Sequence, residues 1–216
     1  IIVNKIEEEC TKFKDRSAEF QKGFTGTAPI PYTILAGTYL VDCEPKIFFE
    51  WKREDEKFIQ LSTKKKANFP ELKIKEMDNP NVNAESIIVA ISTTRRIKKH
   101  QLKDFGEQDI IEIYLDDCKD NNITYIKQLQ NYRKVILDEL EALGRKNYPH
   151  LNQINLVASI PSCMSLEIGR MIAQNNNRVK KIVAYHFVNQ GTKLYPFGIA
   201  VTESQGQYKK GELIQN

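Results

Sequence analysis

Two apolar runs of strand length most constrain what this chain can fold into. Ser86–Ser92 reads SIIVAIS and Ile154–Ser159 reads INLVAS. Each run is short and almost unbroken, which is typical of a strand buried on both faces of a parallel sheet. They predict an α/β protein whose centre is a parallel sheet.

Weaker patterns predict the elements around these two runs. We predict further strands over residues 109–115, 181–188 and 197–202. Helical spacing of apolar residues predicts helices over residues 125–143, ending before Gly144, and about 162–173. The first part of the chain is expected to hold a leading helix or linker over about 2–23, short antiparallel strands over 32–41 and 46–51, and a loop over 64–80 that could add an edge strand at 72–74.

The two apolar runs also resemble each other. In both, an alanine lies near the end of the run, a serine opens the following loop, and a second apolar strand comes later. Repetition of βαβ units in any α/β protein would produce such a likeness. An internal duplication of two Rossmann-like halves would also produce it, and would relate Ser92 and Ser159 by an approximate two-fold axis. In that case a ligand would lie across their junction.

Composition excludes several classes of protein. The 216 residues can bury one substantial core or two small ones. A net charge of +4, from 32 basic and 28 acidic residues, is too small to coat nucleic acid by charge alone, although a local basic site remains possible. No apolar run approaches the roughly 18 residues needed to cross a bilayer. The four widely spaced cysteines suggest neither a zinc site nor a disulfide framework, so we expect a reducing cytoplasm.

The loop after the first apolar run is the first candidate for ligand binding. Ligands of open α/β sheets collect beyond the carboxyl ends of the strands. Hydroxyl and guanidinium groups together suit phosphate, because arginine offers paired donors and a fixed charge. A solvated basic loop would show the same composition. The candidate residues are Ser92, Thr93, Thr94, Arg95 and Arg96, followed by Lys98, Lys99 and His100.

The segment after the second run is the other candidate. Its site residues are Ser159, Pro161, Ser162 and Cys163, with Ser162 as the expected N-cap of a helix. Gly169 weakens that helix and suggests a close contact between the helix and a strand. Trp51, beside Lys52 and Arg53, could stack on a base while the cations meet phosphate, although packing explains it equally well.

Other chemistries find little support. Neither the phosphate-binding GxxxxGK[ST] motif nor GxGxxG occurs in the sequence. Cys163 near a helix N-terminus is a conceivable nucleophile, but no histidine has a spacing that places it alongside. His100, His150 and His186 also lack metal-ligand spacing, so we expect no metal, no cofactor and no catalytic residue.

One segment carries a family resemblance. LVASIPSCMSLEIGR, from Leu156 to Arg170, resembles the C-terminal half of SAVED domains, the cyclic oligonucleotide sensors of bacterial anti-phage systems of the CBASS and CRISPR type. Tyr185 and the Tyr195-Pro196 pair match later parts of that pattern. Ser165 stands where the family often has alanine. The resemblance extends over residues 32–203.

The resemblance implies two fused Rossmann-like halves of the CARF type, sharing one positively lined pocket for a cyclic tri- or tetranucleotide or a related ring. It also implies a fused effector, which would account for a chain that begins at Ile1 without a methionine. We therefore expect residues 1–25 to be a linker or leading helix and 26–216 to be the sensor, with halves of about 26–120 and 121–216.

Three functions follow as hypotheses. The first is a sensor that binds the ring and signals by ligand-driven homo-oligomerisation, which the resemblance implies to be head-to-tail. The second is an enzyme that processes a similar ligand, as a ring nuclease does. The third is a structural or protein-interaction domain, which would need no pocket. A segment rich in Ser, Thr and Arg without a positioned base favours binding over catalysis.

Overall fold

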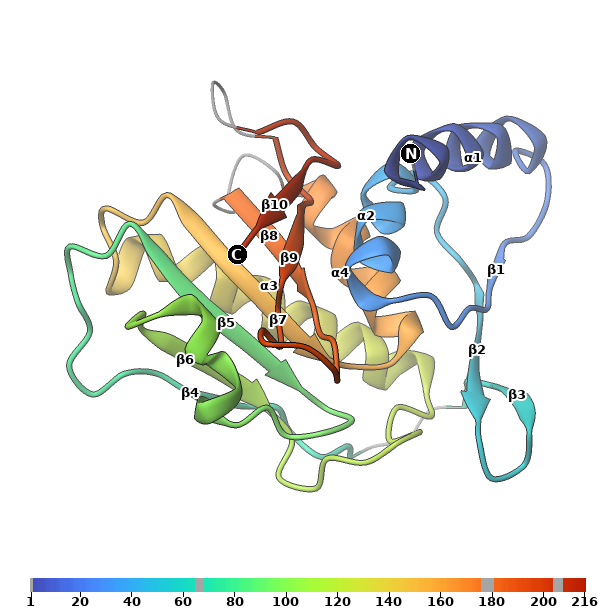
Figure 1. The fold of residues 1–216 in the computed structure, drawn as a ribbon. Coiled ribbons are helices and arrows are strands. Elements are labelled where there is room, and N and C mark those ends of the chain that lie inside the picture. Colours follow the sequence, from blue (N-terminus) through green and yellow to red (C-terminus); the bar gives the residue numbers. More distant parts are fainter. Residues whose placement is uncertain (1, 65–67, 176–180, 204–207) are drawn as a thin grey trace.

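The fold is organised around one mixed sheet. The computed structural model describes residues 2–64, 68–175, 181–203 and 208–216. Within these ranges seven strands form the sheet in the order β10-β9-β8-β7-β5-β6-β4 (Figure 1). Their bounds are β4 Lys73–Lys75, β5 Ser86–Ser92, β6 Ile110–Tyr114, β7 Gln153–Ser159, β8 Lys181–His186, β9 Phe197–Ala200 and β10 Leu213–Gln215.

The two apolar runs form the centre of this sheet. β5 and β7 pair in parallel over their whole length, and Ser92 is the register partner of Ser159. β6 and β8 lie in parallel on the outer sides of this pair, and an antiparallel strand follows on each side, β4 next to β6 and β9 next to β8. The first three strands outward from the junction therefore have the same directions on both sides, and β10 adds a further strand next to β9 only. The approximate two-fold axis between the halves stays a prediction.

Alternate residues of the central strands face two separate cores. Ile87, Val89 and Ile91 of β5 face the larger core, which the helices α2 (Ile30–Tyr39), α3 (Ile126–Lys146) and α4 (Ser162–Gln174) cover. Ile88 and Ala90 face a smaller core beneath the 3-10 helix η1 (Lys99–Phe105). Burial on both faces explains why these strands are continuously apolar. No helix in the described ranges is both long and apolar enough to cross a membrane.

The N-terminal part differs from the prediction in one element. The leading helix is present as α1 (Ile2–Arg16), and residues 46–51 form an antiparallel hairpin of β2 (Ile47–Lys52) with β3 (Lys57–Gln60), while β1 (Gly23–Phe24) adds to β2. The expected strand over residues 32–41 is wrong, because this segment is helix α2. Pro29 and Pro31 suit the first turn of a helix, where the missing N–H is not needed.

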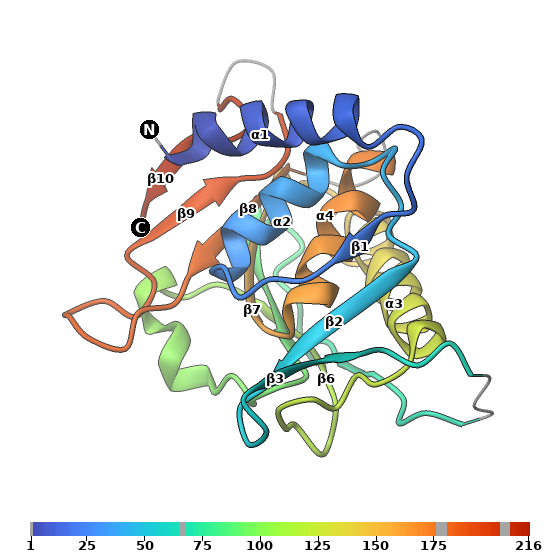
Figure 2. The same ribbon diagram turned by 90° about the vertical axis from the view of Figure 1, so that its right-hand side faces the viewer.

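Helices α2 and α4 touch backbone to backbone. A Cβ atom built at Gly37 would lie 2.3 Å from the carbonyl oxygen of Leu166, and one at Gly169 would lie 1.9 Å from that of Ile34. Figure 2 shows the two helices side by side on the sheet, with α1 crossing the outer side of α2. Gly169 thus permits a close contact with a helix, and the prediction of a close contact with a strand is wrong. Tertiary packing of this kind overrides the strand propensity of residues 32–41.

Candidate functional site

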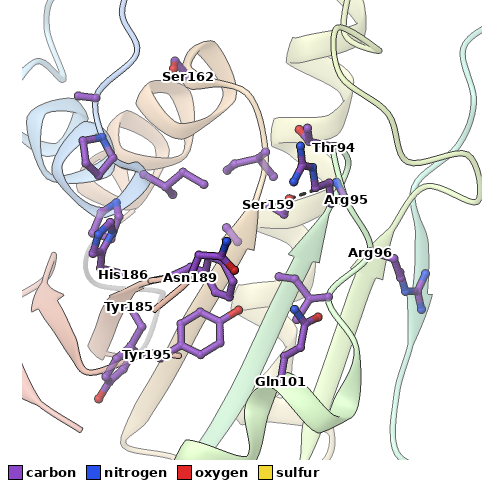
Figure 3. Close-up of a pocket in the computed structure, with 18 residues that line it drawn as sticks. Thr94, Arg95, Arg96, Gln101, Ser159, Ser162, Tyr185, His186, Asn189 and Tyr195 are labelled. Carbon is purple, nitrogen blue, oxygen red and sulfur yellow. Dashed lines mark hydrogen bonds between the residues drawn. The ribbon is translucent and has the colours of Figure 1, made fainter. Parts of the chain in front are cut away.

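A cavity of about 630 Å³ opens at the carboxyl ends of β5, β7 and β8 (Figure 3). Its size lies within the range of small-molecule sites. The start of α2 forms one wall, η1 and the segment after β8 form another, and the loops after β5 and β7 lie between them. The lining residues are Ala28, Pro29, Ile30, Pro31, Thr94, Arg95, Arg96, Ile97, Gln101, Ala158, Ser159, Ile160, Ser162, Tyr185, His186, Phe187, Asn189 and Tyr195.

The β5 loop is bonded directly to the end of β7. The backbone N–H groups of Thr93 and Thr94 each donate to the Ser159 carbonyl at 2.9 Å. The N–H of Arg95 donates to Ser159 Oγ at 3.1 Å. Ser92 is buried, and its Oγ accepts a hydrogen bond from the N–H of Ile97 at 3.0 Å. Ser92 and the fully buried Thr93 therefore shape the loop, whereas Thr94, Arg95 and Ser159 line the cavity.

The two adjacent arginines have different surroundings. Arg96 Nη2 lies 2.5 Å from Glu112 Oε2, and its guanidinium carbon lies 3.2 Å from the centre of the Tyr114 ring. Figure 3 shows its side chain pointing away from the other labelled residues. Arg95 is exposed and forms no ion pair with any residue that the structure describes. Arg95 is thus the arginine available to an anion at the cavity.

The N-terminus of α4 already holds a carboxylate. Glu50 from β2 accepts a hydrogen bond from the N–H of Cys163 at 2.6 Å. Pro161 is the N-cap and Ser162 the first helical residue, so the expected cap at Ser162 is wrong. Burial, together with the nearby Glu50, raises the pKa of the Cys163 thiol well above its ordinary value. Cys163 is fully buried and stays a thiol, which rules against it as a nucleophile.

Two further predicted residues lie outside the cavity lining. Trp51 is on the β2–β3 hairpin, where its ring meets that of Phe58 edge to face at 5.1 Å between ring centres, and the residue is 37% exposed. Pro161 serves as the helix cap. The structure therefore brings together Thr94, Arg95, Ser159 and Ser162, with Arg96 at the edge, but not Trp51, Ser92, Thr93, Pro161 or Cys163.

Sequence reasoning missed the wall on the far side of the cavity. Gln101, Tyr185, His186, Phe187, Asn189 and Tyr195 all line it. The available signal was that β8 ends at His186, because ligands bind beyond the carboxyl ends of parallel strands. Burial lowers the pKa of His186 below its ordinary value, so its imidazole is neutral at pH 7.

The lining has a consistent chemical character. None of the described residues that line the cavity is acidic, one arginine is free of carboxylate partners, and hydroxyl, amide and aromatic groups supply most of the remaining polar and flat surface. Such a site suits an anion that also carries planar groups.

One protein-family model matches most of the chain. The family model SAVED, the SMODS-associated and fused to various effectors sensor domain, matches residues 6–201. The chain belongs to the SAVED family. A search of curated protein sequences finds no significant match.

Solved structures agree with this SAVED assignment at the level of the fold. The Acinetobacter baumannii Cap4 SAVED/CARF-domain receptor with the cyclic trinucleotide 2′3′3′-cAAA has a TM-score of 0.60 at 16% identity, and its match covers 87% of this chain. The Moraxella osloensis Cap4 receptor has a TM-score of 0.52 at 12% identity and also covers 87%. The match covers 40% and 39% of those two chains, so this SAVED domain corresponds to about two fifths of their length.

The last five residues of the SAVED-like segment, LEIGR, lie outside the cavity lining. Arg170 is 2% exposed, and its Nη1 lies 2.5 Å from Glu167 Oε1. The other Glu167 oxygen pairs with Arg133 of α3 at 2.6 Å. Arg170 also donates to the carbonyls of Leu40 and Val41, at the end of α2, at 3.2 Å each. The residues LEIGR therefore join α2, α3 and α4, and do not line the cavity.

Proposed function

We propose that this SAVED domain binds a cyclic oligonucleotide, of tri- or tetranucleotide size or a related ring, in the cavity at the β5–β7 junction. The observation that carries the proposal is the lining: a free Arg95 with hydroxyl donors on one side, aromatic and amide groups on the other, and no acidic residue among those described. The Acinetobacter baumannii Cap4 receptor, which shares the fold, has structures with the cyclic trinucleotides 2′3′3′-cAAA and 3′3′3′-cAAA, and these support this ligand class.

The same arrangement supports transmission of a signal to an N-terminal effector. The starts of α2 and α4 both line the cavity, and the two helices are in backbone contact. On the outer side of α2, the Cys10 thiol of α1 donates to the Ala36 carbonyl at 3.8 Å. The Tyr39 hydroxyl of α2 donates to Glu7 Oε2 of α1 at 3.5 Å. A ligand that moves the start of α2 would therefore move α1. We propose that residues 1–25 connect this sensor, 26–216, to the effector.

A panel of cyclic di-, tri- and tetranucleotides should identify the ligand by melting temperature. A ligand at 100 times its Kd stabilises by about 2.7 kcal/mol. For a domain of this size that corresponds to a rise of roughly 5 to 10 °C. Linear oligonucleotides of the same bases are the control. No shift with any ring, in a protein shown to be folded, would reject the proposal.

The two arginines provide a matched pair of variants within that experiment. Arg95→Ala should lower the affinity for the ligand by about 10- to 150-fold, the effect of one direct charged hydrogen bond. Arg96→Ala should change affinity much less, because its guanidinium is paired with Glu112. Isothermal titration at two salt concentrations measures both. A larger loss for Arg96 would place the phosphates on the other side of the loop.

Ligand is further expected to drive homo-oligomerisation of the complete protein, effector included. A head-to-tail contact is heterologous and can extend into a filament. A shift from 1:99 to 99:1 requires about 5.5 kcal/mol of preferential binding to the assembled state. Light scattering with and without saturating ligand measures the size of the assembly. A protein that stays monomeric while its effector switches on would leave an internal conformational change as the mechanism.

The enzyme alternative keeps one supporting observation. His186 is neutral and lines the cavity, so it could accept a proton during cleavage of a ring. The ligand panel separates the two functions, because a sensor returns the ring intact and a ring nuclease consumes it. Chromatography of the ligand after incubation is sufficient.

A further inference from the structure

A carboxylate joins two distant segments of one wall of the cavity. Asp104 on η1 accepts hydrogen bonds at Oδ2 from the N–H groups of Leu194, at 2.6 Å, and Tyr195, at 2.9 Å. These residues are about 90 positions away from Asp104 in the chain. The contact therefore ties η1, which follows β5, to the turn between β8 and β9.

Aromatic rings pack against one another along this wall. Phe105 meets Tyr185 edge to face at 4.7 Å and lies 5.5 Å from Tyr195. Phe187 continues the series, with its ring centre 5.6 Å from that of Tyr195. The first three residues are 7% exposed or less, whereas Phe187 is 41% exposed and lines the cavity. A buried aromatic cluster thus ends in one exposed ring at the ligand site.

Amide groups lie on the same wall. Gln101 of η1 accepts a hydrogen bond from the N–H of Lys98 through Oε1 at 2.8 Å, and its amide nitrogen donates no hydrogen bond to the described residues. Asn189 is exposed and also lines the cavity. Planar bases are recognised by stacking on a ring and by hydrogen bonds to their edges.

We infer that Phe187 stacks on a base of the ligand and that Asp104 is the positioning residue that holds its wall in place. The inference rests on the proposed function, since it assumes a ligand with bases. The cavity would then have two parts with different roles. Arg95 and the hydroxyls near the β5–β7 junction meet phosphate, and the wall of η1 and residues 185–195 meets a base.

The Phe187 series tests the stacking contact directly, with 3′3′3′-cAAA as the probe and isothermal titration as the measurement. Phe187→Ala should weaken binding by about 5- to 150-fold, the loss of one base–aromatic stack. Phe187→Leu should lose most of the same affinity, because it keeps apolar bulk without a π face. Phe187→Tyr keeps the ring and should bind as the wild type does. Equal affinity of Phe187→Ala and wild type would overturn the inference.

A double-mutant cycle tests the role of Asp104. Asp104→Ala should lower the affinity for the probe. Its effect should not add to that of Phe187→Ala, because both substitutions remove the same stacking contact. It should add to the effect of Arg95→Ala, which acts in the loop after β5. Asp104→Asn retains an oxygen that can accept the same two hydrogen bonds and should restore affinity. Full additivity of Asp104 with Phe187 would overturn the positioning role.

Two controls keep the outcomes distinct. Circular dichroism and melting temperature show whether each variant is folded; if Asp104→Ala is not, Asp104→Glu, which displaces the carboxylate by one methylene, replaces it in the cycle. If the wild type binds neither 3′3′3′-cAAA nor any other ring of the panel, the proposed function is contradicted. Binding by wild type that survives loss of the Phe187 ring contradicts this inference alone.

Discussion

Replacing Arg170 by methionine should lower the free energy of unfolding by about 3 to 5 kcal/mol, the usual effect of removing one partner of a buried ion pair. The side chain is 2% exposed and pairs with Glu167. Its loss removes the guanidinium donors from the Leu40 and Val41 carbonyls, of which Leu40 keeps the N–H of Cys43, and leaves Glu167 with Arg133 as its remaining partner. Urea denaturation followed by circular dichroism measures the change.

Arg145→Met is the matched control for this substitution. Arg145 is on α3, its side chain is 74% exposed, and it lies 3.7 Å from Glu141. Removal of a surface pair of this kind should cost no more than about 1 kcal/mol. If Arg170→Met were as mild as Arg145→Met, the three-helix junction would owe its stability to apolar packing and not to the charged network.

Gly169→Ala should destabilise the domain by at least about 3 kcal/mol, the upper end of ordinary overpacking. Alanine favours a helix over glycine by roughly 1 kcal/mol, so helix propensity alone predicts a gain. The added Cβ would lie 1.9 Å from the Ile34 carbonyl oxygen. Because the obstacle is backbone and not a flexible side chain, α2 and α4 must separate, and the cavity walls at their starts must move.

Gln174→Ala, an exposed position at the end of α4, is the control for Gly169→Ala, with an expected change within about 0.5 kcal/mol. Melting temperature and ligand affinity are measured for both. A Gly169→Ala protein with unchanged stability and unchanged affinity would contradict the backbone contact between the helices.

Residues with a strong local pattern could be predicted from the sequence. The apolar runs now in β5 and β7 were assigned correctly because burial on both faces leaves no polar alternation. The long helix α3 could be predicted because its apolar residues recur at helical spacing, although its predicted end before Gly144 is wrong, since α3 continues to Lys146. Polar residues that directly follow strand ends pointed to Thr94, Arg95 and Ser159, because the carboxyl ends of parallel strands meet at one edge.

Partners distant in sequence could not be predicted. Arg95 and Arg96 are neighbours with the same side chain, yet Glu112 and Tyr114 from β6 engage Arg96. Glu50 reaches the start of α4 from 113 residues away, and Asp104 reaches the turn before Tyr195 from 91 residues away. None of these contacts produces a local sequence pattern, because the partners come close together only when the whole chain has folded.

The sequence alone thus determined the central sheet, the helix α3 and the family, and it pointed to the sheet edge at which the cavity lies. Tertiary structure decided that residues 30–39 form a helix, that Gly169 meets Gly37, and which side chains face the cavity. The physical reason is the range of the interactions. Periodic burial acts along a few consecutive residues and is visible in them, whereas backbone contact between helices, ion pairing and aromatic packing join segments that only the folded chain brings together.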